Sequence, residues 1–291
     1  MPRINRCVEL FAQGQPVYYT GVGHGGYEAG REAAGTWADY FAYDMEHHPY
    51  DIVGLREFMR GLIEAGPTRS GHRTPTVIVT LPFDGTSPAV VRANAWIIKQ
   101  VLACGVHGLL LVHAESPEAV KAFVECSRYQ FNDIAVGAGL NQGRRGSGGQ
   151  ADAAATWGVP MREYLDIAEP WPLNPRGELL LGLKIENKQA LSTVELSLKV
   201  PGIAFAEWGP GDMAMSFGFA DNHDEPFPPV LEAARSRILA ACKANDIKFL
   251  NTVYERDVTM RIDEGVGICA GKDGEAAAKI GRAYTKRTMP V

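Results

Sequence analysis

The chain has 291 residues, enough for one large domain or two ordinary ones, and its 46% hydrophobic and 22% charged residues are typical of a globular protein with a large core. The formal net charge of −5 argues against a nucleic-acid-binding protein, which needs a basic surface. No run of about 18 apolar residues exists, so a membrane span is excluded, and we expect no signal peptide because the first residues lack a long apolar core.

Short apolar runs predict eight strands. They span 16–22, 40–45, 75–81, 107–113, 179–186, 202–208, 247–253 and 266–270. Most of these runs are nearly continuous in apolar character rather than alternating with polar residues. Such runs are typical of strands buried on both faces, and therefore of a parallel sheet.

Helical patterns lie between the apolar runs. Residues 53–64 and 229–245 repeat apolar side chains every three to four positions. Ser87 and Ser116 each precede a proline and predict helix starts, the first helix running to Gly105.

Eight strands with intervening helices in fewer than 300 residues predict one α/β domain over 1–291, a (β/α)8 barrel. The alternative is a doubly wound open sheet. Gly21–Gly26 has the GxGxxG spacing of a dinucleotide-binding turn after the first strand, but no acidic residue follows in a clear ribose-binding role.

Residues 131–178 do not fit a strand–helix unit. They hold a glycine- and arginine-rich stretch, 141–150, and a proline-rich stretch, 168–178, with short helical patterns between them. We expect a long excursion over one mouth of the barrel, because long loops in compact domains are usually functional.

Polar side chains follow several of the predicted strands. Asp44 to His48 end the second, His113 and Glu115 the fourth, Lys184 to Asn187 the fifth, and Glu207 to Asp212 the sixth. The active site of a parallel barrel lies at the carboxyl ends of its strands, so these groups converge on one mouth. Two carboxylates with open positions are the usual protein contribution to a Mg²⁺ or Mn²⁺ site.

At these positions the sequence resembles the class II, metal-dependent 2-oxo acid aldolases of the HpcH/HpaI type, over roughly residues 16–271. The resemblance is carried by DMEHHPYD (44–51), LPFDGTSP (81–88), RYQFN with a later RRGSGG (128–149), ATWG (155–158), KIENKQAL (184–191) and GPGDMAMSFGF (209–219). The last two motifs are the most specific. The family implies a barrel of the phosphoenolpyruvate/pyruvate-binding type, with a C-terminal helix exchanged between subunits of a homo-oligomer, a trimer or hexamer.

The resemblance also implies the site. Glu186 and Asp212 match two protein ligands of a divalent metal, Mg²⁺, Mn²⁺ or Co²⁺. His47 matches an acid/base histidine, and Asp44 the carboxylate that orients it. The backbone amides around Gly211 and Asp212 would hold the carboxylate of a pyruvate-like substrate.

Other residues keep open roles. Ser216 lies in the same loop as Asp212 and is a candidate for substrate binding. Arg145, with its neighbour in the arginine-rich loop, could hold an acidic substrate. Trp208 either packs against the mouth or forms a wall of the substrate site. His113 is either a hydrogen-bonded core residue or part of the site.

One departure from the family concerns the end of the third strand. Family members carry an arginine there that binds the keto oxygen, whereas this chain has Leu81 next to Thr80. Another cation could replace it, namely Arg144, Arg145 or Lys184. By strand alternation Lys184 shares a face with Glu186, so it lies either near the metal or in a layer where an acid pairs with it.

We therefore expect an aldolase, a carbon–carbon lyase of aromatic compound catabolism that joins or separates a pyruvate-like enolate and an aldehyde. Its substrates would be a small 2-oxo acid and an aldehyde, without nucleic-acid or membrane partners. One alternative is altered chemistry at the same metal, such as a decarboxylase, hydrolase or hydratase, because of Leu81. Another is a non-catalytic barrel that binds a metabolite. Five scattered cysteines without CxxC spacing favour a cytoplasmic protein.

Overall fold

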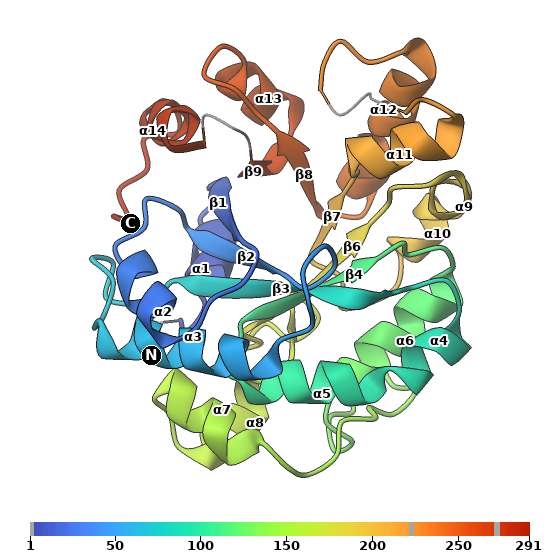
Figure 1. The fold of residues 1–291 in the computed structure, drawn as a ribbon. Coiled ribbons are helices and arrows are strands. Elements are labelled where there is room, and N and C mark those ends of the chain that lie inside the picture. The colour runs from blue at the N-terminus through green and yellow to red at the C-terminus, as the bar shows by residue number, and fades with distance from the viewer. Residues whose placement is uncertain (1–2, 221–223, 271–273) are drawn as a thin grey trace.

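Eight parallel strands close into a barrel in the computed structural model, which describes residues 3–220, 224–270 and 274–291 (Figure 1). The barrel strands are β1 Val17–Val22, β2 Tyr40–Asp44, β3 Thr76–Asp84, β4 Gly108–Val112, β6 Leu179–Lys184, β7 Phe205–Glu207, β8 Lys248–Thr252 and β9 Val266–Ala270. Neighbours pair in chain order, and the pairings of β4 with β6 and of β9 with β1 close the ring. The predicted (β/α)8 barrel is confirmed, and the open doubly wound sheet is wrong.

The inward-facing side chains form an apolar lower layer and a polar upper layer. The lower layer includes Val17, Tyr40, Ile78, Leu110, Leu180 and Phe205. It packs against helix α1, Arg6–Ala12, and this helix closes the amino-terminal end of the barrel. Gly182 makes room for this layer, since a Cβ there would lie 2.2 Å from the ring of Phe205. The upper layer, at the carboxyl ends of the strands, contains Asp44, Thr80, Lys184 and Glu207.

Helices surround the barrel, and their apolar faces pack on the outward-facing strand residues. They are α2 Tyr27–Ala33, α3 Ile52–Glu64, α4 Pro88–Ala93, α5 Ala95–Ala103, α6 Pro117–Ser127, α9 Lys188–Ser192, α10 Val194–Ser197, α11 Pro210–Phe217, α12 Pro229–Ala244, α13 Val258–Glu264 and α14 Gly274–Tyr284. The hydroxyls of Ser87 and Ser116 cap α4 and α6, as the sequence predicts. The single helix expected up to Gly105 is two helices, because the chain breaks at Asn94, whose side chain bonds back to the carbonyl of Val90.

The segment 131–178 lies at the amino-terminal ends of the strands, beside the outer helices. It contains α7 Gln150–Trp157 and α8 Met161–Ile167 (Figure 1). It also contains a short strand, β5 Pro170–Trp171, which pairs with the start of β6. The indole of Trp157 donates to the carbonyl of Gly105, just before β4. The segment therefore lies away from the mouth formed by the carboxyl ends of the strands.

Helix α14 packs on its own barrel in the single chain, against α13 and strands β1 and β9. Close contact is possible because a Cβ at Gly281 would lie 2.0 Å from the hydroxyl of Tyr18. Exchange of this helix between subunits stays a prediction. Within the described residues, no helix combines the length and apolar character needed to cross a bilayer.

Candidate active site at the carboxyl ends of the strands

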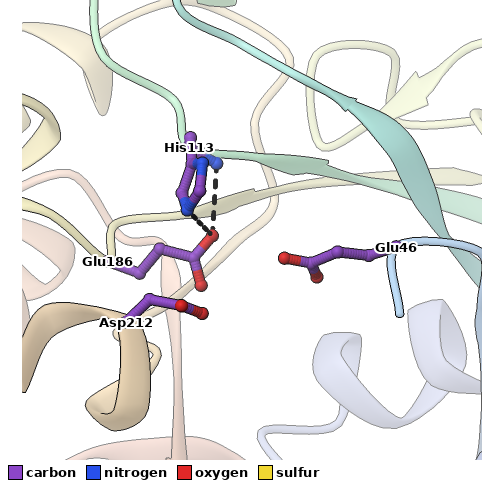
Figure 2. A group of neighbouring side chains, drawn as sticks. All are labelled: Glu46, His113, Glu186 and Asp212. Carbon is purple, nitrogen blue, oxygen red and sulfur yellow. Dashed lines mark hydrogen bonds and ion pairs between the residues drawn. The ribbon is translucent and has the colours of Figure 1, made fainter. Parts of the chain in front are cut away.

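Four side chains from separate parts of the chain approach one another at the carboxyl ends of the strands. Glu46 follows β2, His113 follows β4, Glu186 follows β6, and Asp212 lies in the first turn of α11. One ligand-type atom from each lies within 4.8 Å of the others. Figure 2 shows Glu46 facing the other three from the opposite side. We call these four residues the rim cluster.

Glu186 is the buried centre of the rim cluster. Its side chain is fully buried, and its Oε1 accepts a hydrogen bond from the backbone N–H of His113 at 3.2 Å. Its Oε2 lies 3.0 Å from the ammonium of Lys184, but within the described part of the chain it accepts no hydrogen bond of good geometry. Burial raises the pKa of Glu186 to about 8, and the positive charge of Lys184 only partly opposes this effect.

Lys184 lies inside the barrel among carboxylates. Its Nζ is 2.6 Å from Glu46 Oε2, and its backbone is in register with Glu207 on the next strand. Burial alone would lower the pKa of Lys184, but Glu207, Glu186 and Glu46 outweigh it and hold the pKa above its usual value. Both readings of Lys184 therefore apply, because it is near the cluster and paired with acids. A lysine held as an ammonium has no lone pair to attack a carbonyl.

Asp44 and His47 form the pair that the sequence predicts. Asp44 Oδ2 is 2.9 Å from His47 Nδ1, while Oδ1 accepts from the backbone N–H groups of Glu46 and His47. Burial would raise the pKa of Asp44, but these hydrogen bonds outweigh it and lower the pKa. Because an ionised carboxylate can only accept, Nδ1 carries the proton, while Nε2 lies 3.7 Å from Glu46 Oε1. The His47 side chain is 59% exposed, so Nε2 can exchange protons with a ligand or with water.

His113 stands at a bend after β4. Its φ of 44° is in the left-handed region, which is uncommon for a residue with a side chain. The ring lies between two carboxylates: Nδ1 is 3.2 Å from Asp84 Oδ1, and Nε2 is 3.5 Å from Glu186 Oε1. Its position next to Glu186 places it in the site rather than in the core.

The loop before α11 fits closely over Glu186. A Cβ at Gly209 would lie 2.5 Å from Glu186 Oε2, so the backbone passes there only without a side chain. Gly211 and Asp212 follow in the first turn of α11, where backbone N–H groups have no partner within the helix. Ser216 is in the last turn, and its hydroxyl accepts from the backbone N–H of Lys188, which joins α11 to α9.

A cavity of about 190 Å³ lies above the apolar lower layer, and Glu46 is the member of the rim cluster that lines it. Asp44, Glu46, His47, Lys184 and Glu207 line its polar side. This volume is that of about six water molecules, enough for a small acid of a few heavy atoms. Burial also raises the pKa of Glu207.

The end of β3 brings no cation to this cavity. Thr80 lines it, whereas Leu81 points outward and is fully buried in the core between strands and helices. Of the cations considered from the sequence, the structure brings only Lys184 to the cavity.

The structure does not bring Arg145 to this site. Its guanidinium is buried 4.3 Å from the ring centre of Tyr129 and donates to the hydroxyl of Tyr164, at the amino-terminal end of the barrel. Arg144 bonds through its backbone to Glu125 in the same region. These contacts hold the 131–178 segment together. We therefore do not assign Arg145 to substrate binding.

Trp208 packs beside the site rather than in the cavity. It is 2% exposed, and its ring meets the edge of Phe227 with centroids 5.0 Å apart. This placement favours the packing role over that of a substrate wall.

Three residues near the site had no individual role in the sequence interpretation. Glu46 stands two positions after Asp44, and strand alternation could have placed both on one face. Asp84 lies in the LPFDGTSP motif, but its contact with His113 depends on the bend after β4. Glu207 is opposite Lys184 through the strand register, which the sequence does not display.

The donor set of the rim cluster fits a divalent metal ion. Carboxylates are the oxygen ligands that such ions prefer, and the buried Glu186 Oε2 accepts no hydrogen bond among the described residues. Among the residues that the structure describes, Lys184 is the one ammonium against the carboxylates of Glu46, Glu186 and Glu207. An added double positive charge would offset the cost of burying these anions.

Comparisons with known proteins find relatives that are named as aldolases. A hydroxypyruvate/pyruvate aldolase of Agrobacterium fabrum is 29% identical over 232 residues, covering 77% of this chain and 72% of the relative. A 2-keto-3-deoxy-L-rhamnonate aldolase of Escherichia coli is 28% identical over 213 residues, covering 73% and 67%. The fold matches a solved HpcH/HpaI aldolase/citrate lyase family protein from Burkholderia cenocepacia with a TM-score of 0.72, at 22% identity over 97% of this chain and 98% of that one.

The family itself follows from a match along most of the chain. Residues 70–270 match the model of the family described as HpcH/HpaI aldolase/citrate lyase. The matched range includes three of the four residues of the rim cluster, His113, Glu186 and Asp212. The resemblance seen in the sequence motifs is confirmed, and so is the prediction of a carbon–carbon lyase. The chain belongs to the HpcH/HpaI aldolase/citrate lyase family.

Proposed function

We propose that this protein is a divalent-metal-dependent aldolase that forms or cleaves the bond between a pyruvate-like enolate and an aldehyde, with a 4-hydroxy-2-oxo acid as the joined compound. The observation that carries the proposal is that Glu46 joins two groups: it clusters with Glu186 and Asp212, and it lines one small cavity together with the Asp44–His47 pair. Two relatives named as aldolases, one of pyruvate and one of a 2-keto acid, support this substrate class.

In this proposal Glu186 and Asp212 hold the metal ion. When bound, the ion supplies positive charge that stabilises the negative charge developing on the keto oxygen of the substrate. The backbone N–H groups of Gly211 and Asp212 bind the substrate carboxylate, since the first turn of a helix offers free donors and a partial positive charge. Mg²⁺, Mn²⁺ and Co²⁺ all suit such a site.

His47 moves the proton. For cleavage, Nε2 takes the proton of the substrate hydroxyl as the carbon–carbon bond breaks, and it returns the proton in the reverse direction. Asp44 holds Nδ1–H at 2.9 Å, so the lone pair stays on Nε2 and the imidazolium that forms is stabilised. Lys184 supplies the fixed positive charge that the family arginine would supply at position 81, where this chain has the buried Leu81.

The absence of a cation at Thr80 and Leu81 favours a second candidate, in which the same site catalyses decarboxylation, hydrolysis or hydration of a related acid. Both candidates share the metal and differ in the products. A homo-oligomer, a cytoplasmic location and a role in aromatic compound catabolism stay predictions.

The test couples pyruvate release from a 4-hydroxy-2-oxo acid to lactate dehydrogenase. We expect activity to vanish with EDTA, to return with Mn²⁺, and to fall by at least about 100-fold in kcat for Asp44→Asn. Asp152→Asn is the matched control, because that carboxylate is exposed on α7 at the opposite end of the barrel. Full activity in EDTA would exclude both candidates. Metal-dependent turnover of a 2-oxo acid without aldehyde release would exclude the first and favour the second.

A further inference from the structure

The imidazole of His113 is aimed at the carboxylate that anchors the rim cluster. Its Nε2 lies 3.5 Å from Glu186 Oε1, and its backbone N–H bonds to the same oxygen at 3.2 Å (Figure 2). Two contacts from one residue fix the orientation of this oxygen relative to the ring.

The other ring nitrogen is held by a carboxylate at the end of β3. Nδ1 is 3.2 Å from Asp84 Oδ1, within ion-pair distance. The other nitrogen, Nε2, faces Glu186 Oε1, and both of these atoms are of the kind that binds a cation.

A carboxylate that orients one nitrogen while the other faces a cation site is the usual surrounding of a metal-binding histidine. Two atoms that bind one ion at about 2.1 Å lie about 3.0 Å apart at a right angle and about 3.4 Å apart at a tetrahedral angle. The observed separation of 3.5 Å between Nε2 and Glu186 Oε1 is close to the second value.

The backbone at His113 supports the same reading. A φ of 44° is strained for a residue with a side chain, and such strain persists where the surroundings enforce it. Here the bend turns the chain out of β4 and directs the ring toward Glu186.

We propose that His113 is a third protein ligand of the metal ion, oriented by Asp84, and that its nitrogen makes the site prefer a borderline transition ion such as Co²⁺ or Zn²⁺ over Mg²⁺. This inference rests on the metal site of the proposed function and deepens it. The preference follows from chemistry, because imidazole binds the later first-row ions well, whereas Mg²⁺ is bound mainly by oxygen and keeps its waters.

The test uses metal-free protein and needs no turnover. Calorimetric titration with Co²⁺ and with Mg²⁺ compares wild type, His113→Asn, Asp84→Asn and the control His48→Ala, which removes an exposed imidazole nearby. Asparagine tolerates the left-handed backbone, so His113→Asn keeps the bend. Pulsed electron paramagnetic resonance of the Mn²⁺-loaded proteins reports a directly bound nitrogen.

We expect His113→Asn to weaken Co²⁺ binding about 10- to 100-fold, to change Mg²⁺ binding by less than about 3-fold, and to lose the nitrogen signal. Asp84→Asn should weaken Co²⁺ binding about 10-fold and keep the signal, and the control should match wild type. Unchanged Co²⁺ affinity with a retained nitrogen signal in His113→Asn overturns this inference alone. Wild-type protein that binds neither ion overturns the proposed function as well.

Discussion

Replacing Lys184 by methionine tests the charge balance at the centre of the barrel. The methionine keeps most of the apolar stem and removes the ammonium, which lies 2.6 Å from Glu46 and 3.0 Å from Glu186. Both carboxylates are largely buried, so neither can turn to water for compensation.

The expected effect follows from these distances. At an effective dielectric constant of about 20, the attraction over 2.6 Å between the ammonium and an ionised Glu46 amounts to about 6 kcal/mol, which the cost of burying the two charges largely offsets. Removing one partner of a buried pair usually costs about 3–5 kcal/mol, because the remaining charge is uncompensated. We expect Lys184→Met to lose free energy of unfolding in this range.

Urea unfolding in EDTA at pH 8 measures the loss, and repeating it with Mn²⁺ shows how far a metal ion replaces the ammonium. The control is Lys99→Met, an exposed lysine on α5 for which we expect a change within about 0.5 kcal/mol. If Lys184→Met in EDTA is within about 1 kcal/mol of wild type, the carboxylates are not ionised around the ammonium and the reasoning is refuted.

Two further changes probe the fold beside the site. His107 is buried, its Nδ1 accepts from the backbone N–H of Val77, and burial lowers its pKa to about 3. The neutral ring therefore contributes fully to the free energy of unfolding above pH 6.5, and we expect that free energy to fall by about 2 kcal/mol by pH 5. A His107→Gln variant that shows the same pH dependence in urea unfolding would contradict this. Gly209→Ala places a methyl group 2.5 Å from Glu186 Oε2, and we expect it to weaken Mn²⁺ binding at least about 10-fold in a calorimetric titration. Unchanged Mn²⁺ affinity would contradict the close fit of the backbone over Glu186. The control is Gly35→Ala, because the space around Gly35 is open.

The strands were predictable because of where they lie. Each strand packs against the barrel interior on one face and against the surrounding helices on the other. Both faces therefore need apolar side chains, which gives the continuous apolar runs in the sequence. The helix starts at Ser87 and Ser116 were predictable from a local pattern that the two share, a capping hydroxyl directly before a proline. The 131–178 segment was not, because glycines and arginines suggest an open loop, whereas Arg145 is buried against Tyr129 through contacts distant in sequence.

Some contacts of the candidate site were also predictable from the sequence, and others were not. The Asp44–His47 pair lies within one turn of chain, and the family motif was enough to predict it. Glu186 and Asp212 come from separate loops, and their proximity followed from the closure of the barrel. The contacts of Lys184 with Glu46 and of His113 with Asp84 depend on strand register and on one bent residue, which no local pattern encodes.

Helix α1 and the apolar layer above it give the barrel a floor, so the cavity opens to water at one end only. Both fragments of a cleaved molecule must then leave by the route along which the parent compound entered. In the proposed function the metal ion and the backbone N–H groups of Gly211 and Asp212 would hold the 2-oxo acid, so this fragment would stay until the aldehyde has gone. This order would make the aldehyde the first product to depart and would let the 2-oxo acid act as a dead-end occupant when it accumulates.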